Sequence, residues 1–506
     1  MSRMVSAAVS LSLLAASVAA ATPAFAGKAD DTLVATFAAQ LPSLDRFYAP
    51  GREGFLLGLL IYDTLIYRDT QTFELKSLLA TDWKWIDEKT LELHLRKGVT
   101  FHNGDPFTAK DVAYTFNFAA DPKNKVFDRI TSAWIERVEV IDDYTVRLHA
   151  SKVTPLALQY IVQVPMMPAD HREKIGLQAF SEQPVGTGPY KVAGKKGSDI
   201  VFERFDSYFD GGPKTKPEIK TLVYRTVPDV NTQVAELARG GVDWAWYIPA
   251  DQAERLAAIP TVTVVNAPTF RIGFLTMDAA GLATPDGPLT DTRVRQAINH
   301  AIDRQAIAKT LIGGSAEPIR SACNPIQFGC EQDVKDYAYE PQRAKQLLAE
   351  AGFADGFDID IYGFRSRPVA EAIVGYLGAV GIRANLVWQQ YSAVVQQRRD
   401  RKAALVIDDF GSSGIADAGA PTKFYFNGAP DDQSRDAEVD AWLEEAGSTN
   451  DADSRKQAFS AAFKRIADQA YWTPLFTMPI NYVMSAELEG PVPKDENVEF
   501  WKYHWK

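Results

Sequence analysis

Histidine, serine and acidic side chains are abundant in this chain, but their spacing matches no catalytic or metal-binding motif. No two of the six histidines stand four residues apart, the spacing that places two imidazoles on one helix face. The run Gly411–Gly414 lacks the Gly-x-Ser-x-Gly order of a nucleophile elbow. The acidic pair Asp142–Asp143 falls in an expected solvated turn. We therefore expect no catalytic residues, no metal site and no cofactor.

A polar loop in the second half of the chain is a better candidate for binding. Residues 404–409 have the pattern of a strand, and the chain then opens at Phe410 into a Gly/Ser-rich segment that ends at Asp417. In α/β folds, ligands bind at the carboxyl ends of such strands. Asp417 is equally well explained as the side chain that closes an Asx-type turn. Both interpretations stay open at this point.

Two further segments carry side chains suited to binding. Arg365 and Arg367 lie between an expected strand and an expected helix, and a guanidinium group suits a carboxylate. We expect one of them to point inward and the other to be solvated. Trp244 and Trp246 alternate along an expected strand and therefore share one face. That face could line a pocket or belong to the core.

The two cysteines, Cys323 and Cys330, enclose a short loop that contains proline and glycine. In an exported protein they could form a disulfide, which would stabilise the fold by roughly 2–3 kcal/mol at most. Two free thiols that bind metal are the weaker alternative, because the spacing fits no common zinc motif.

The N-terminus has the features of a secretory signal peptide over residues 1–26. Arg3 provides the positive charge, an alanine-rich apolar stretch follows, and Ala24–Ala26 has the small-x-small pattern of a cleavage site. We expect cleavage after Ala26 and a periplasmic protein; an uncleaved membrane anchor is the alternative. The net charge of −11 argues against nucleic acid as a partner.

The segment Leu91–Phe116 is the strongest local signal. Alternating leucines predict a strand, Asn103–Pro106 a turn, and Thr108 with Asp111 the capped start of a helix. The whole segment closely resembles the signature of the family-5 solute-binding proteins, the peptide and nickel receptors of bacterial ABC importers. Matching positions are Arg96, Lys97, Gly98, Phe101, His102, Gly104, Thr108, Ala109, Asp111 and Val112. The segments 186–190 and 293–304 resemble further family motifs.

This resemblance covers the mature chain and implies an α/β protein with a type-II periplasmic-binding fold. Two lobes would be joined by two hinge crossings, near 264–270 and 471–476, with an extra α+β domain inserted. The implied division is a signal peptide at 1–26, lobe I at 27–55, 181–267 and 475–506, the extra domain at 56–180, and lobe II at 268–474.

The resemblance also implies a function, the capture of a peptide or similar small polar solute between closing lobes for delivery to an ABC permease. Asp417 would hold a ligand ammonium, as in the peptide receptors, and Arg365 a carboxylate. Trp244, Trp246 and Phe410 would pack against the body of the ligand. We expect a monomer without enzymatic activity. The alternatives are an opine, glycoside or nickel-chelate receptor, a periplasmic hydrolase, and a chemoreceptor adaptor or chaperone.

Overall fold

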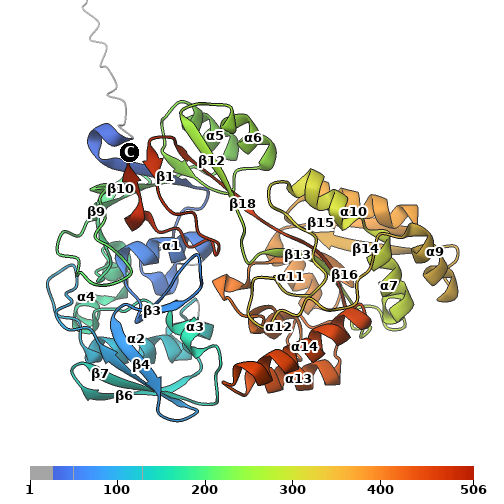
Figure 1. Ribbon diagram of the computed structural model, residues 1–506, viewed down its shortest axis with the longest axis horizontal. Helices are drawn as coiled ribbons and strands as arrows, with labels where there is room; N and C mark the ends of the chain where they lie inside the picture. The colour runs from blue at the N-terminus through green and yellow to red at the C-terminus, as the bar shows by residue number, and fades with distance from the viewer. Residues whose placement is uncertain (1–26, 50, 128) are drawn as a thin grey trace, which may run out of the picture.

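The computed structural model describes residues 27–49, 51–127 and 129–506. The predicted signal peptide lies outside the described residues. Two halves face each other, and each is built on its own large sheet (Figure 1). Among the described residues, no helix combines the length and apolar character that a membrane span needs.

Lobe I, as we call the part built on the seven-stranded sheet, has a parallel centre. Strand β1 lies between β11 and β10 and runs parallel to both. Its side chains Leu33–Ala35 and Phe37 are at most 1% exposed. The strands, in sheet order, are β12 (Val262–Ala267), β18 (Ile480–Ser485), β11 (Trp244–Ala245), β1 (Thr32–Phe37), β10 (Thr221–Thr226), β9 (Asp199–Arg204) and β8 (Tyr190–Lys196). The helices are α1 (Gly51–Ile61), α5 (Val230–Ala238) and α6 (Ala250–Ala257).

The extra domain is built on a four-stranded antiparallel sheet with the order β4 (Ala80–Trp85), β5 (Thr90–Leu95), β7 (Thr145–Ala150) and β6 (Ile135–Asp142). Its helices are α2 (Ala109–Ala120), α3 (Ala157–Ile161) and α4 (Ala169–Glu182), and a small hairpin joins β2 (Ile66–Arg68) to β3 (Leu75–Ser77). The alternating leucines of β5 are buried, as expected from their period. One hydrophobic core contains residues of this domain and of lobe I, so the two pack as a single body.

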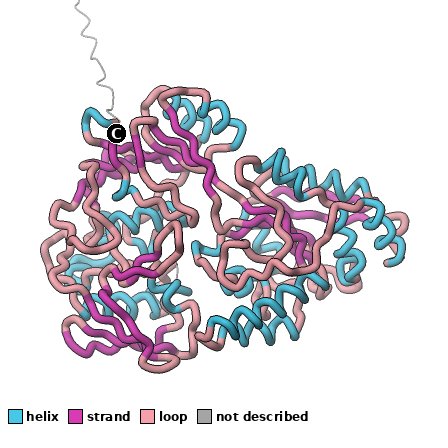
Figure 2. Tube along the Cα trace, in the orientation of Figure 1, coloured by secondary structure: helices cyan, strands magenta, loops and turns pink. Residues whose placement is uncertain are grey.

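Lobe II has a five-stranded sheet with helices on both sides (Figure 2). The strand order is β15 (Ile382–Trp388), β14 (Phe357–Gly363), β16 (Leu405–Phe410), β13 (Ile272–Met277) and β17 (Trp472–Thr477). The helices are α7 (Thr292–Ala301), α8 (Arg304–Ile307), α9 (Pro341–Glu350), α10 (Arg367–Ala379), α11 (Tyr391–Arg399), α12 (Gly419–Tyr425), α13 (Ala437–Gly447) and α14 (Ala452–Asp468). Two large hydrophobic clusters lie within this lobe. Near the C-terminus, β19 (Leu488–Glu489) pairs with β20 (His504–Trp505).

The chain passes between lobe I and lobe II at residues 268–271 and again at 478–479, between β12 and β13 and between β17 and β18. The second crossing lies later than the expected 471–476. Residues 475–477, expected in lobe I, extend β17 instead, because Phe476 and Thr477 pair with Gly273 and Ile272 of β13. The other domain limits stay predictions.

The signature segment is used for architecture. Phe101 is buried, and the imidazole of His102 joins the signature turn to the turn at Gly186–Gly188. Its Nε2 donates to the Gly188 carbonyl at 2.9 Å, and its Nδ1 accepts the Gly186 N–H at 3.3 Å. This pattern needs a neutral ring. Accordingly, burial lowers the pKa of His102 to about 4.

We predict that His102 makes the fold sensitive to acid. Between pH 6.5 and 4 an unfolded histidine binds a proton that the folded one resists, so the free energy of unfolding falls as pH drops through this window. The loss should reach roughly 3 kcal/mol and level off below pH 4. Urea unfolding at pH 7 and pH 4.5 measures it. His102→Asn should be less stable at pH 7 but lose less on acidification; an unchanged difference between the two pH values would contradict the assignment.

Candidate functional site

The two crossings lie side by side and are hydrogen bonded to each other. Met478 N–H donates to the Arg271 carbonyl at 2.9 Å, and the Thr269 hydroxyl donates to the Met478 carbonyl at 2.8 Å. The Arg271 N–H in turn donates to the Thr269 hydroxyl oxygen at 2.8 Å. Two short connections tied at one point form the kind of linkage about which domains hinge.

Arg271 lies on this linkage and faces acidic residues of both lobes. It forms an ion pair with Asp409 at the end of β16, and its Nε lies 3.7 Å from a carboxylate oxygen of Glu496 on the lobe I side. Glu496 also accepts a hydrogen bond from Arg52 of α1 at 3.1 Å. Burial opposes the charge of Arg271, but the carboxylates of Glu496 and Asp409 outweigh it and raise the pKa of Arg271. The linkage therefore carries a permanent positive charge, and acids of both lobes balance it.

Both carboxylates of the acidic pair at the end of β16, Asp408 and Asp409, have protein partners. Asp408 accepts hydrogen bonds from Arg398 at 2.6 Å and from the Tyr425 hydroxyl at 3.1 Å. Asp409 pairs with both Arg271 and Arg365. These contacts make the two carboxylates structural partners of arginine.

Of the two arginines expected near a ligand, Arg365 is the one directed toward the junction of the lobes. Its guanidinium pairs with Asp409 while the side chain is 49% exposed. Arg367 instead pairs with Glu371 one turn along the exposed face of α10, at 2.8 Å. A carboxylate-binding role for Arg365 stays a prediction, and Asp409 is its partner in this structure.

Asp417 is buried, and its carboxylate forms hydrogen bonds with other residues of the protein. One of its carboxylate oxygens accepts the Gly419 N–H at 2.8 Å and the guanidinium of Arg455 at 2.9 Å. Asp417 and Arg455 are both buried. The hydrogen bond to residue i+2 is that of an Asx turn, so the turn-closing interpretation describes this structure. A ligand ammonium would have to share the carboxylate with Arg455.

A disulfide-closed loop supports the Asp417 segment from the other side. Cys323 and Cys330 are bonded, and the loop between them pairs with residues 415–418. Phe328 exchanges backbone hydrogen bonds with Ala416 and Ala418 at 3.0 and 2.9 Å, and the Gln327 side chain donates to the Ile415 carbonyl at 2.8 Å. The disulfide therefore holds the segment that the sequence pointed to as a binding loop.

The predicted aromatic contacts need correction for the tryptophans. Trp244 is 0% exposed and packs among Phe37, Tyr482 and Phe500, and Trp246 is 4% exposed in the same core. Both are core residues here: Trp244 lies on β11, and Trp246, just beyond the end of this short strand, packs against Phe37 and Trp244. Phe410 is half-buried and packs against Phe424 and Tyr425 within lobe II.

Lobe II contacts the body formed by lobe I and the extra domain through the loop that follows β16. We call this body and lobe II the two bodies. Arg68 of β2 donates to the Gly414 carbonyl, and Gln163 donates to the Ser413 carbonyl at 3.3 Å. Ser412 and Ser413 have φ values of 51° and 52°, in the left-handed region that serine rarely adopts. The loop is held in this conformation where the two bodies meet.

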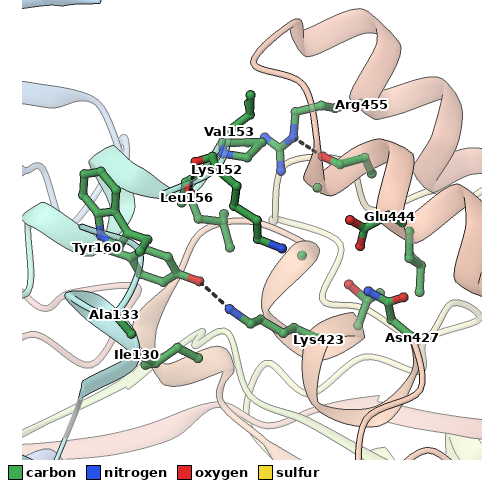
Figure 3. Close-up of a pocket in the computed structure, with 18 of the residues that line it drawn as sticks. Ile130, Ala133, Lys152, Val153, Leu156, Tyr160, Lys423, Asn427, Glu444 and Arg455 are labelled. Carbon is green, nitrogen blue, oxygen red and sulfur yellow. Dashed lines mark hydrogen bonds between the residues drawn. The ribbon is translucent and has the colours of Figure 1, made fainter. Parts of the chain in front are cut away.

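A cavity of about 260 Å³ lies beside this contact, between the extra domain and lobe II (Figure 3). One wall comes from α3 and the segment after β7, and the other comes from α12, α13 and α14. Apolar surface is provided by Trp134, Leu156 and Phe459, and polar groups by Lys152, Tyr160, Lys423, Asn427, Glu444 and Arg455. Arg455 links this cavity to the Asp417 loop. A concave, mostly apolar site with a few polar groups is typical of small-molecule binding.

Sequence reasoning did not identify the lysines and Tyr160 of this cavity. Lys152 and Lys423 are separated by more than half the chain and belong to different bodies. Isolated lysines and tyrosines have no motif, so only the folded arrangement brings them to one site. Proximity to Asp417 in sequence was the one available signal, since Lys423 follows on the next helix.

Comparison with known proteins identifies relatives over almost the whole length. The family model described as bacterial extracellular solute-binding proteins, family 5, matches residues 74–433. A dipeptide-binding protein of Escherichia coli is 29% identical over 455 residues, covering 81% of this chain and 82% of that protein. Heme-binding protein A of Haemophilus influenzae is 26% identical over 459 residues, covering 82% and 81%.

Solved structures share the fold. A dipeptide-binding protein of Pseudoalteromonas sp. SM9913, crystallised in complex with Met-Leu, superposes with a TM-score of 0.79 at 24% identity and covers 94% of this chain and all of that one. The two-lobed α/β fold expected from the sequence is therefore confirmed.

We predict that Arg455 orders the Asp417 loop. Arg455→Met removes the buried partner of Asp417 and should destabilise the protein by about 3 kcal/mol, because one carboxylate is left without its counter-charge. Hydrogen exchange measured by mass spectrometry should become faster at residues 415–420. Gln457→Met, at an exposed position of α14, is the control and should leave this exchange unchanged. Equal protection in the two variants would show that the ion pair does not order the loop.

Proposed function

This chain belongs to the bacterial extracellular solute-binding proteins of family 5, and we propose that it captures a peptide or a similar small polar solute and delivers it unchanged to an ABC permease. The observation that carries the proposal is the cavity to which both bodies contribute walls. A site divided in this way is complete only when the bodies are together. Its occupation can therefore be linked to closure.

The dimensions and lining of the cavity favour a small solute with mixed character. Its volume of about 260 Å³ lies just below the range of roughly 300–1,000 Å³ that is usual for ligand pockets. Trp134 and Phe459 can pack against apolar parts of the ligand, while lysine, tyrosine and asparagine side chains can bind its polar ends. The dipeptide-binding relative supports a peptide as the first candidate.

The mechanism follows from the contacts between the bodies. Opening must break the hydrogen bonds of Arg68 to Gly414 and of Gln163 to Ser413, and it must separate Lys423 from Tyr160. A ligand that touches both walls adds contacts that exist only in the closed state, so it shifts the population toward closure. The permease would then recognise the closed form.

Export and partners complete the proposal. We propose that the signal peptide is cleaved after Ala26 and that the mature protein acts in the periplasm as a monomer. No covalent step is part of the proposal, since it requires only capture and release.

A panel of dipeptides, tripeptides, opines, sugars, nickel chelates and haem tests the function by thermal unfolding. A true ligand at 100 times its Kd should add about 2.7 kcal/mol to the free energy of unfolding. Ala133→Trp, which fills the cavity, should lose this gain, whereas Ala349→Trp on the exposed side of α9 should keep it. Turnover of a panel member, or a gain that Ala133→Trp leaves intact, would contradict the proposal.

A further inference from the structure

The cavity between the extra domain and lobe II contains two lysines without acidic partners. Neither Lys152 nor Lys423 forms an ion pair with a carboxylate among the residues that the structure describes. Lys423 Nζ instead lies 3.5 Å from the hydroxyl oxygen of Tyr160 (Figure 3). Burial, together with the charge of Lys152, lowers the pKa of Lys423. Both lysines are exposed residues that line the cavity, and the repulsion between their charges is one cause of this shift.

Tyr160 provides a third donor at the same place. Burial and the nearby charge of Asp417 raise the pKa of Tyr160 to about 12, so the phenol keeps its proton. Its oxygen accepts from Lys423, and none of its hydrogen bonds in the described structure uses the O–H proton. The hydroxyl can therefore donate to a group placed in the cavity.

The acidic groups nearby do not cancel this positive charge. Asp417 is occupied by Arg455. Glu444 lines the cavity on an exposed position of α13, where it forms no ion pair with either lysine, and its charge is not among the causes that shift the pKa of Lys423. Figure 3 shows both lysine side chains extending into the space between Tyr160 and Glu444.

We propose that Lys152, Lys423 and Tyr160 form a subsite for an anionic group of the solute, a carboxylate or a phosphate. This inference rests on the proposed function, because it describes the ligand of the same cavity. Two ammonium groups and one hydroxyl supply charge-assisted hydrogen bonds of the kind that hold such anions. A neutral amide or sugar hydroxyl would form only hydrogen bonds without opposite charge with these exposed lysines.

The division of the two lysines between the bodies gives the subsite a second role. Lys152 follows β7 in the extra domain, and Lys423 lies on α12 of lobe II. Closure brings two like charges together, which opposes the closed state when the cavity is empty. An anion between them changes this repulsion into attraction to a common partner. The subsite therefore couples the charge of the solute to closure.

The test uses succinate and inorganic phosphate as minimal anionic probes. Succinamide has the same carbon skeleton as succinate but no charge, and it serves as the neutral control. Binding is measured by titration calorimetry at low salt. Succinate or phosphate should bind the wild type, and succinamide should bind at least tenfold more weakly. Lys152→Met and Lys423→Met should each weaken anion binding by about ten- to hundredfold, the range of a charge-assisted hydrogen bond. Lys345→Met on the exposed face of α9 is the charge-matched control and should bind as the wild type does.

A second measurement reads the coupling without any ligand. Small-angle scattering of the empty protein should show a larger closed population for Lys152→Met than for Lys345→Met, because the repulsion is gone. Anions that bind the lysine variants as tightly as the wild type, or fail to bind the wild type, would overturn the subsite. A neutral peptide amide that still stabilises the wild type and both lysine variants equally would overturn the anionic assignment while leaving solute capture in place.

Discussion

The hydrogen-bonded pair of crossings is the constraint on which the rest of the structure depends. In the described part of the chain, the backbone passes between lobe II and lobe I at residues 268–271 and 478–479, and Thr269 and Arg271 hydrogen bond one crossing to the other. Lobe II accordingly has its own hydrophobic clusters, while lobe I and the extra domain share a core. The contact between the bodies is partly apolar, because Ile415 and Ala420 of lobe II pack into the core that lobe I and the extra domain share. Their relative position is then decided by this small apolar contact together with the polar contacts of Arg68 and Gln163, and a ligand that binds both bodies adds to the closed state.

The most recognisable motifs of the chain build this rigid frame and leave the site to less recognisable residues. His102 of the signature binds the turn at Gly186–Gly188, so two family motifs meet at one buried imidazole. Gly188 has no room for a side chain, because a Cβ atom there would lie 2.4 Å from the Leu60 carbonyl oxygen. The sequence pattern is strict where backbones approach closely. At the cavity, by contrast, many different side chains could occupy the same positions, and this freedom suits a family whose relatives bind different solutes.

Sequence patterns predicted most of the frame and little of the site, for identifiable reasons. The leucines of β5, the cap at Thr108 and the two-lobed fold depend on local periodicity or on motifs, and both can be read along the chain. The period of a strand shows that Trp244 and Trp246 share a face, but it cannot show that Phe37 and Phe500 cover that face. Likewise, the partner of Asp417 lies 38 residues away on α14. Contacts between distant segments have no local sequence signature. Lys152 and Lys423, which are separated by more than half the chain, are the clearest example.

The pairing of charges near the cleft explains why the lysine pair matters for the solute. Arg52 has Glu496, Arg68 has Asp495, and Arg271 has both Asp409 and Glu496. Buried charges are tolerated when they are paired in this way, and a ligand gains little by competing for them. Lys152 and Lys423 differ from these arginines, because they are exposed and, among the described residues, neither forms an ion pair with a carboxylate. A bound anion can therefore form ion pairs with these lysines without displacing a carboxylate of the protein, and the two lysines belong to different bodies.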